Sequence, residues 1–285
     1  MRLDAFASPQ AYYPIKKAVF INALVVETDE SVTTNAKSLL LPIEKERMMD
    51  SLQGKVTWIT GASRGIGQAT ALAMARAGAD VAVTARTERQ LRTLVDEIQA
   101  ETGRRALACA ADMAQEVDVK RAVQAALAAF GRIDILVNNA GFNSRKAPLW
   151  EVTTEEWDAM MAVNLRGAFL CCREVLPTMI ERRSGHIINV ISTATEIGLE
   201  TMGAYSATKW GLLGMTRVLT KEARPYGIRV SAISPGGTDT TFRASPRPDY
   251  LAPATVAEAI VFMASLPEQA VVHDLVVRPI VETNF

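Results

Sequence analysis

The residues of this chain best suited to chemistry are a tyrosine and a lysine four positions apart, Tyr205 and Lys209, in the run Tyr-Ser-Ala-Thr-Lys. On a helix, residues at this spacing lie one above the other on a single face. A neighbouring ammonium group lowers the pKa of a phenol from its usual value of about 10 toward neutrality. Such a phenol can transfer a proton to or from a carbonyl oxygen. Alone, the pair is a weak signal, because many helices carry it by chance.

A glycine-rich segment, Thr60–Gly67, is the second chemical signal, with glycines at 61, 65 and 67. It follows the apolar run Val56–Ile59, which is typical of a buried strand, and it precedes the alanine-rich stretch 68–75, which favours a helix. Glycines let the backbone approach a ligand closely, and a helix N-terminus presents free N–H groups and a positive dipole. A strand, a glycine-rich turn and a helix in this order predict a phosphate-binding site.

Strand and helix patterns alternate along most of the chain. Strands are expected near 55–60, 80–85, 105–109, 133–137, 185–191, 228–233 and 274–278, and helices near 66–78, 87–101, 115–130, 154–161, 164–183, 204–224 and 254–265. Several strands are runs of β-branched and other apolar residues, which is typical of strands covered on both faces. The pattern predicts an α/β fold, a doubly wound parallel sheet of about seven strands with helices on both faces.

Together these motifs resemble those of the short-chain dehydrogenase/reductase family. The resemblance runs from about Gly54 to the C-terminus. It rests on the glycine-rich segment, on Asn138–Gly141 and Pro235-Gly236, each after a strand, and on Asn164, Ser192, Tyr205 and Lys209 in the family's order. It implies a Rossmann-type sheet with strand order 3-2-1-4-5-6-7 and a site at the carboxyl ends of the strands. It also implies an oxidoreductase that uses a nicotinamide cofactor.

The resemblance further implies which residues bind that cofactor. They are Gly61, Ser63, Arg64, Gly65, Ile66 and Gly67; Arg86, Asp112 and Met113; Asn138, Ala140 and Gly141; Tyr205 and Lys209; and Pro235, Gly236, Thr238 and Thr240. The second strand ends in Ala85-Arg86, without the acidic residue that NAD-binding enzymes commonly place there. Arg64 and Arg86 could bind a phosphate through bidentate, charge-assisted hydrogen bonds. We therefore expect NADP(H) as the cofactor.

Four residues are expected to be catalytic by the same resemblance, namely Asn164, Ser192, Tyr205 and Lys209. Tyr205 would give its proton to the substrate oxygen, and Ser192 would donate a hydrogen bond to that oxygen. Lys209 would lower the pKa of Tyr205 and bind the nicotinamide ribose. Asn164 would hold a water molecule that links Lys209 to solvent.

The expected reaction interconverts a carbonyl and a secondary alcohol on a small substrate such as a keto acid, a diketone or an aldehyde. The lid at 242–251 is short and contains proline, which argues against a deep, steroid-sized pocket, and its Arg243 or Arg247 could bind a carboxylate or a phosphate. The stretch 265–279 resembles NADP-dependent 3-hydroxy acid dehydrogenases and broad carbonyl reductases. Two alternatives stay open: a 3-oxoacyl-thioester (acyl-carrier) reductase, and a non-catalytic NADP-binding sensor or scaffold.

The composition argues against other classes of function. Net charge is zero, with 31 basic and 31 acidic residues, whereas a nucleic-acid-binding protein usually carries a basic surplus. No apolar run approaches the length of about 18 residues that spans a membrane. Cys109, Cys171 and Cys172 fit neither a disulfide framework nor a zinc site, and His186 and His273 have no partner at ligand spacing. We expect a cytoplasmic protein without a metal.

Domain organisation and assembly follow from the same patterns. Residues 1–53 lie outside the alternation and are expected to form a poorly ordered or loosely packed extension, while residues 54–285 form one catalytic domain. The helices expected near 164–183 and 204–224 carry more apolar residues than a single inward stripe requires. In the family these two helices pair across a two-fold axis, so the resemblance implies a homo-oligomer, a tetramer or a dimer.

Overall fold

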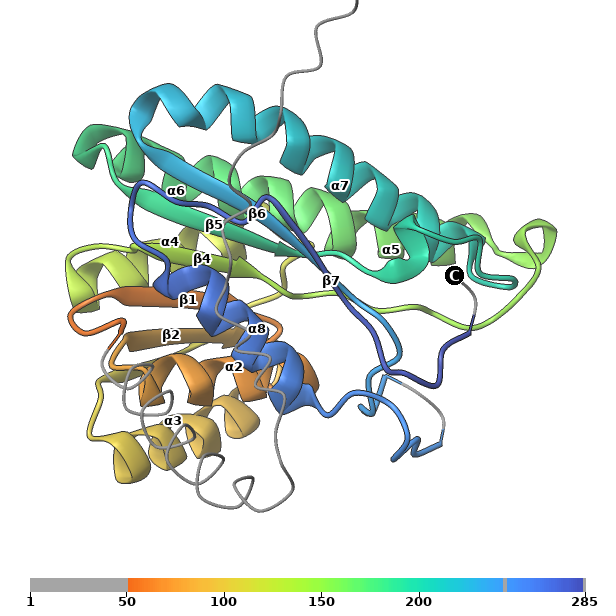
Figure 1. The fold of residues 1–285 in the computed structure, drawn as a ribbon, viewed down its shortest axis with the longest axis horizontal. Helices are drawn as coiled ribbons and strands as arrows, with labels where there is room; N and C mark the ends of the chain where they lie inside the picture. Colours follow the sequence, from red (N-terminus) through yellow and green to blue (C-terminus); the bar gives the residue numbers. More distant parts are fainter. Residues whose placement is uncertain (1–50, 243–244, 284–285) are drawn as a thin grey trace, which may run out of the picture. The chain divides into compact units, whose positions relative to one another are not determined.

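Seven parallel strands form one sheet in the computed structural model, which describes residues 51–242 and 245–283 (Figure 1). In chain order they are β1 (Val56–Thr60), β2 (Asp80–Ala85), β3 (Ala106–Ala110), β4 (Ile135–Asn138), β5 (Gly185–Val190), β6 (Ile228–Pro235) and β7 (Asp274–Val277). Their spatial order is β3-β2-β1-β4-β5-β6-β7, and every neighbouring pair is parallel. The predicted fold class and strand order are therefore confirmed.

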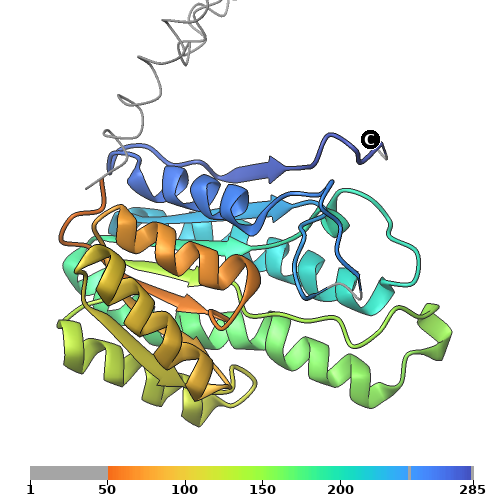
Figure 2. The ribbon, with the colours of Figure 1, turned by 90° about the horizontal axis from the view of Figure 1, so that it is seen from below.

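Helices cover both faces of the sheet, as Figure 2 shows from below. One face packs against α2 (Gly65–Arg76), α3 (Glu88–Thr102) and α8 (Pro253–Ser265), and the other against α4 (Glu116–Phe130), α6 (Ala168–Arg182) and α7 (Gly203–Ala223). The short helix α5 (Thr154–Met161) leads into α6 through a π-helical turn, η2 (Ala162–Gly167). Short 3₁₀ turns lie at η1 (Leu149–Glu151), η3 (Thr193–Thr195) and η4 (Arg224–Tyr226).

Local sequence explains why these segments take these forms. All five residues of β1 are buried, as expected for a strand with helices on both faces. On α3, the buried side chains of Leu91, Leu94 and Ile98 recur every three or four residues and form one inward stripe. The helix ends at Gly103, which has a φ of +66° that favours glycine.

The N-terminal end of the described chain packs against the core. The side chain of Leu52 is buried, and its backbone N–H donates to the carbonyl of Ala77 at 2.8 Å. Residues 1–50, which make up most of the predicted extension, lie outside the described residues. Across 51–242 and 245–283, none of the helices has both the length and the apolar character that crossing a membrane requires.

Candidate active site

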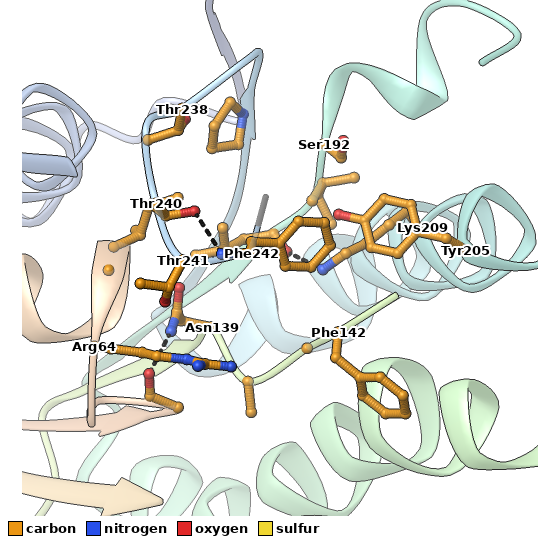
Figure 3. A pocket seen from close by; sticks show the side chains of 18 of the residues that line it. Arg64, Asn139, Phe142, Ser192, Tyr205, Lys209, Thr238, Thr240, Thr241 and Phe242 are labelled. Carbon is orange, nitrogen blue, oxygen red and sulfur yellow. Dashed lines mark hydrogen bonds between the residues drawn. The ribbon is translucent and has the colours of Figure 1, made fainter. Parts of the chain in front are cut away.

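A cavity of about 720 Å³ opens at the carboxyl ends of the strands, where the loops that follow them meet (Figure 3). This is the position expected for a ligand in a doubly wound sheet. The predicted site residues that line it are Gly61, Ser63, Arg64, Gly65, Ile66, Arg86, Asp112, Met113, Ala140, Gly141, Ser192, Tyr205, Lys209, Pro235, Gly236, Thr238 and Thr240. Three predicted residues, Gly67, Asn138 and Asn164, do not line it.

The glycine-rich turn after β1 brings backbone close to the cavity. A Cβ atom on Gly61 would lie 2.8 Å from the Cα of Ala140, and one on Gly67 would lie 2.3 Å from the carbonyl oxygen of Gly61. Gly67 thus permits close packing inside the turn, although it was predicted to bind the cofactor. Arg64 is the N-cap of α2, yet its side chain makes no capping hydrogen bond. The N-terminus of α2 is therefore suited to a phosphate group.

Two arginines lie at the same end of the cavity. Arg64 and Arg86 are both exposed, and neither forms an ion pair with any other residue of the described chain. Arg86 directly follows β2, and the first carboxylate after it, Glu88, is paired with Arg92 at 2.6 Å. These donors fit the additional phosphate of NADP(H) better than a ribose hydroxyl, which an acidic residue would bind.

The two neighbouring asparagines after β4 have different roles. Asn138 is buried, and its Nδ2 donates to Oδ1 of Asn189 at 2.8 Å, which ties β4 to β5. Asn139 lines the cavity instead, and its Nδ2 donates to the carbonyls of Thr60 (2.9 Å) and Gly61 (3.1 Å). Asn139 was not among the residues predicted from the sequence to bind the cofactor. Strand alternation, which points successive side chains to opposite faces, was the available signal.

Three of the four residues predicted to be catalytic line the cavity (Figure 3). Tyr205 and Lys209 both come from α7, and Ser192 follows β5. The Nζ atom of Lys209 donates to the carbonyl of Val190 at 2.8 Å and lies 5.8 Å from the centre of the Tyr205 ring. A phenol, a hydroxyl and an ammonium group in one cavity form a unit that can deliver a proton and stabilise charge on an oxygen.

Burial controls the ionisation of this pair. Burial raises the pKa of Tyr205 to about 12, although its hydrogen bond with Ser192 acts in the opposite direction. Burial also lowers the pKa of Lys209 to about 8. The sequence-based expectation of a lowered tyrosine pKa is therefore wrong for this structure, because the phenolate would be desolvated. Tyr205 keeps its proton at neutral pH.

Asn164 lies in the π-helical turn η2, next to α7. It is fully buried; its Nδ2 donates to the carbonyl of Phe142 (2.8 Å) and to Oγ1 of Thr208 (3.1 Å), and its Oδ1 accepts from the N–H of Phe142 (2.9 Å). The side chain therefore connects the loop after β4 to α7, between Tyr205 and Lys209. A continuous helix was expected over 164–183, but η2 replaces its first turn.

The predicted anion-binding lid residue is occupied by contacts within the protein. Arg247 pairs with Asp249 at 2.6 Å, and its guanidinium lies 4.0 Å from the centre of the Tyr250 ring. It does not line the cavity. Arg243, the other candidate, lies outside the described residues.

Within the described ranges, no group of three histidine, cysteine or acidic side chains is arranged to hold a metal ion.

Apolar side chains also line the cavity. They include Phe142, Ile197, Leu199, Met202 and Phe242, and the charged residues Lys146 and Glu200 line it as well. The ring of Phe242 packs edge-on against Tyr205, with 5.7 Å between the ring centres. Apart from Phe242 in the predicted lid, none of these residues was singled out from the sequence, because they belong to loops without a recognisable motif.

Comparison with known proteins agrees with this geometry. Residues 55–251 match the family model of the short chain dehydrogenases. A D-threitol dehydrogenase of Mycolicibacterium smegmatis is 39% identical over 229 residues, which cover 75% of this chain and 87% of that protein. A metagenomic short-chain oxidoreductase, solved in complex with NADP, is 37% identical with a TM-score of 0.73, covering 81% of this chain and 100% of its own.

A third similar protein is the 3-ketoacyl-(acyl-carrier-protein) reductase of Brucella melitensis, solved in complex with NADH. It is 35% identical with a TM-score of 0.73, covering 80% of this chain and 98% of its own. Sheet order, cavity position and these matches lead to one conclusion. The chain belongs to the short-chain dehydrogenase/reductase family, whose members are oxidoreductases.

Proposed function

We propose that this protein is an NADP(H)-dependent oxidoreductase that interconverts a carbonyl and a secondary alcohol on a small substrate. One observation carries the proposal: a single cavity is lined by Ser192, Tyr205 and Lys209 and also by the glycine-rich turn with Arg64 and Arg86. A proton donor and a phosphate-binding end in one cavity are what reduction by a dinucleotide requires.

The bound cofactor would supply or accept the hydride. Arg64 and Arg86 would bind its 2′-phosphate, and the first turn of α2 would bind its pyrophosphate. The loop after β6 would hold the nicotinamide end through Thr238 and Thr240, which both line the cavity. The metagenomic relative was solved with NADP, which supports this choice, whereas the Brucella relative was solved with NADH.

Tyr205 would act as the general acid during reduction. It is protonated at neutral pH, because burial raises its pKa to about 12. Ser192 would donate a hydrogen bond to the substrate oxygen. Lys209 is held by Val190 and carries a positive charge below a pH of about 8; this charge favours the phenolate that remains after proton transfer. Asn164 would support the helix that carries both residues.

Substrate choice has a second candidate. The activity named for the Brucella relative favours reduction of a 3-oxoacyl thioester, whereas that of the Mycolicibacterium relative favours a small polyol or its ketone. A non-catalytic sensor or scaffold is the alternative of another class, and the grouping of Ser192, Tyr205 and Lys209 in one cavity counts against it.

A substrate panel tests the proposal. Purified protein should oxidise NADPH, followed by its absorbance, with at least one of a set of keto acids, diketones and aldehydes. A 3-oxoacyl thioester is tested separately. Faster turnover with the thioester would identify it, rather than a small carbonyl compound, as the preferred substrate. Tight NADPH binding without turnover on any compound would instead indicate the sensor or scaffold.

Assembly is part of the proposal. Of the apolar residues on α6, most are buried within the chain, but Phe169 and Ile180 are exposed, as are Trp210 and Val218 on α7. Exposed apolar side chains on these two helices favour self-association. We expect a tetramer or a dimer by light scattering at micromolar concentration; a fully active monomer of about 31 kDa would contradict this.

A cytoplasmic location completes the proposal. Cys109, Cys171 and Cys172 are all buried free thiols, which is common in proteins of reducing compartments.

A further inference from the structure

The chain after β7 lies against the loop that follows β6. That loop lines the cavity. Figure 2 shows this segment continuing past the carboxyl ends of the strands. In it, Oε1 of Glu282 accepts a hydrogen bond from the backbone N–H of Gly237 at 2.8 Å, and Oε2 accepts one from Nε of Arg278 at 3.0 Å. The side chains of Glu282 and Arg278 are only 16% and 9% exposed. A surface ion pair would be far more open to water.

The two glycines of the loop provide the space for this contact. A Cβ atom on Gly237 would lie 2.7 Å from Oε1 of Glu282 and 2.3 Å from the Tyr250 ring. A Cβ atom on Gly236 would lie 2.6 Å from Oε2 of Glu282. Any side chain at these positions would displace Glu282. The Gly-Gly sequence and the glutamate therefore belong to one arrangement, although they are separated by 45 residues.

Further hydrogen bonds fix the backbone on both sides of this contact. The N–H of Gly236 donates to the carbonyl of Val277 at 2.8 Å, which continues the pairing of β6 with β7. The carbonyl of Gly237 accepts from the N–H of Leu251 at 3.0 Å. The N–H of Gly236 therefore bonds to backbone, whereas the N–H of Gly237 bonds to a side chain, that of Glu282. Thr238 and Thr240 follow directly and line the cavity.

We propose that Glu282 is a positioning residue for hydride transfer, which it serves by holding the Gly236–Thr240 loop at the cavity. The inference rests on the proposed function, because that loop would bind the nicotinamide end of the cofactor. Arg278 holds the glutamate side chain in place through its hydrogen bond to Oε2, and hydrogen bonds to a carboxylate are stronger than those to a neutral acceptor. Misplacement of a reacting group by about 1 Å can cost about 100-fold in rate.

Amide hydrogen exchange tests the contact between Glu282 and the loop without an assay of enzyme activity. Glu282→Ala should make amide exchange in peptides covering 236–240 about tenfold faster or more, because the loop opens more readily. Glu282→Gln keeps an oxygen acceptor and should stay closer to the wild-type rate. The control is Glu268→Ala, which removes an exposed carboxylate that pairs with Lys55 away from the cavity. Unchanged exchange in Glu282→Ala would overturn the proposal.

Kinetics then test the consequence for catalysis. With the best substrate of the panel, Glu282→Ala should lower kcat about tenfold. The Kd for NADPH should change by less than about threefold, because Arg64 and Arg86 bind the other end of the molecule. Deuterium in the transferred position of NADPH should slow the variant more than the wild type. Glu282→Gln should recover most of the lost rate, and Glu268→Ala should match the wild type.

The outcomes separate this proposal from the proposed function. A wild-type protein without activity on the whole panel would contradict the proposed function, and the exchange experiment would still decide the contact. An active wild type with an equally active Glu282→Ala variant would contradict the positioning role alone. Equal losses in Glu282→Ala and Glu282→Gln would also overturn it, because the acceptor oxygen would then be irrelevant.

Discussion

Replacing Tyr205 with phenylalanine is expected to lower kcat about 10²–10⁴-fold, the range associated with the loss of a general acid. The phenol is the only group of Tyr205 that can transfer a proton. Its ring packs against Phe242 and would stay in place, so the shape of the cavity should be unchanged. Initial rates with the best substrate of the panel measure the loss, and fluorescence titration with NADPH should give a Kd near the wild-type value.

Tyr226 provides the matched control for this substitution. It lies in η4, is 41% exposed, and is remote from the cavity lining. Tyr226→Phe removes the same hydroxyl from the same residue type, and its rate should equal that of the wild type. If Tyr205→Phe retained wild-type turnover, the assignment of Tyr205 as the general acid would be wrong.

The fold was predictable because its signals are local and repeated. Apolar strand runs alternate with amphipathic helices such as α3, and the glycine-rich turn marks the first crossover. Parallel strands joined by helices have few arrangements, since crossovers are right-handed. The motif residues Ser192, Tyr205 and Lys209 converge because they follow or flank adjacent strands at their carboxyl ends.

The errors concern contacts between distant segments. Asn138 bonds to Asn189 of β5, whereas Asn139, the residue after β4, bonds to Thr60 and lines the cavity. The turn η2 forms where Asn164 bonds to Phe142 and Thr208. No local pattern contains the partners of Asn164, whereas strand alternation could have indicated which asparagine faces the cavity. The pKa of Tyr205 was expected to fall because its lysine neighbour was visible in the sequence, whereas its burial was not.

Glu282 shows the same limit most clearly. Its partner Gly237 is 45 positions away, and an isolated glutamate near a C-terminus carries no motif. Only the packing of the segment after β7 beside the loop after β6 brings them together. Sequence motifs therefore predicted residues that line the cavity, whereas the contact between Glu282 and Gly237 became visible only in the three-dimensional structure.

The second large effect is expected for cofactor choice. Arg86→Ala should raise the KM for NADPH about tenfold or more and should leave the KM for NADH nearly unchanged. A hydrogen bond to a charged group contributes about 1.5–3 kcal/mol, and about 1.4 kcal/mol corresponds to a factor of ten. Because only NADPH carries the 2′-phosphate, only its binding loses this contribution. Adding Arg64→Ala should increase the loss further, since both guanidiniums line the same end of the cavity.

Parallel KM measurements with both cofactors, at a fixed salt concentration, check this result. Arg89→Ala is the control, because Arg89 is an exposed arginine on α3 that does not line the cavity. It removes the same charge from the same region, so any long-range electrostatic effect on the anionic cofactor would appear in it as well. An equal rise in the KM for NADPH and NADH in Arg86→Ala would show that Arg86 supports the structure rather than selecting the cofactor. A rise confined to NADPH, and absent from Arg89→Ala, would assign the discrimination to a direct contact with the phosphate.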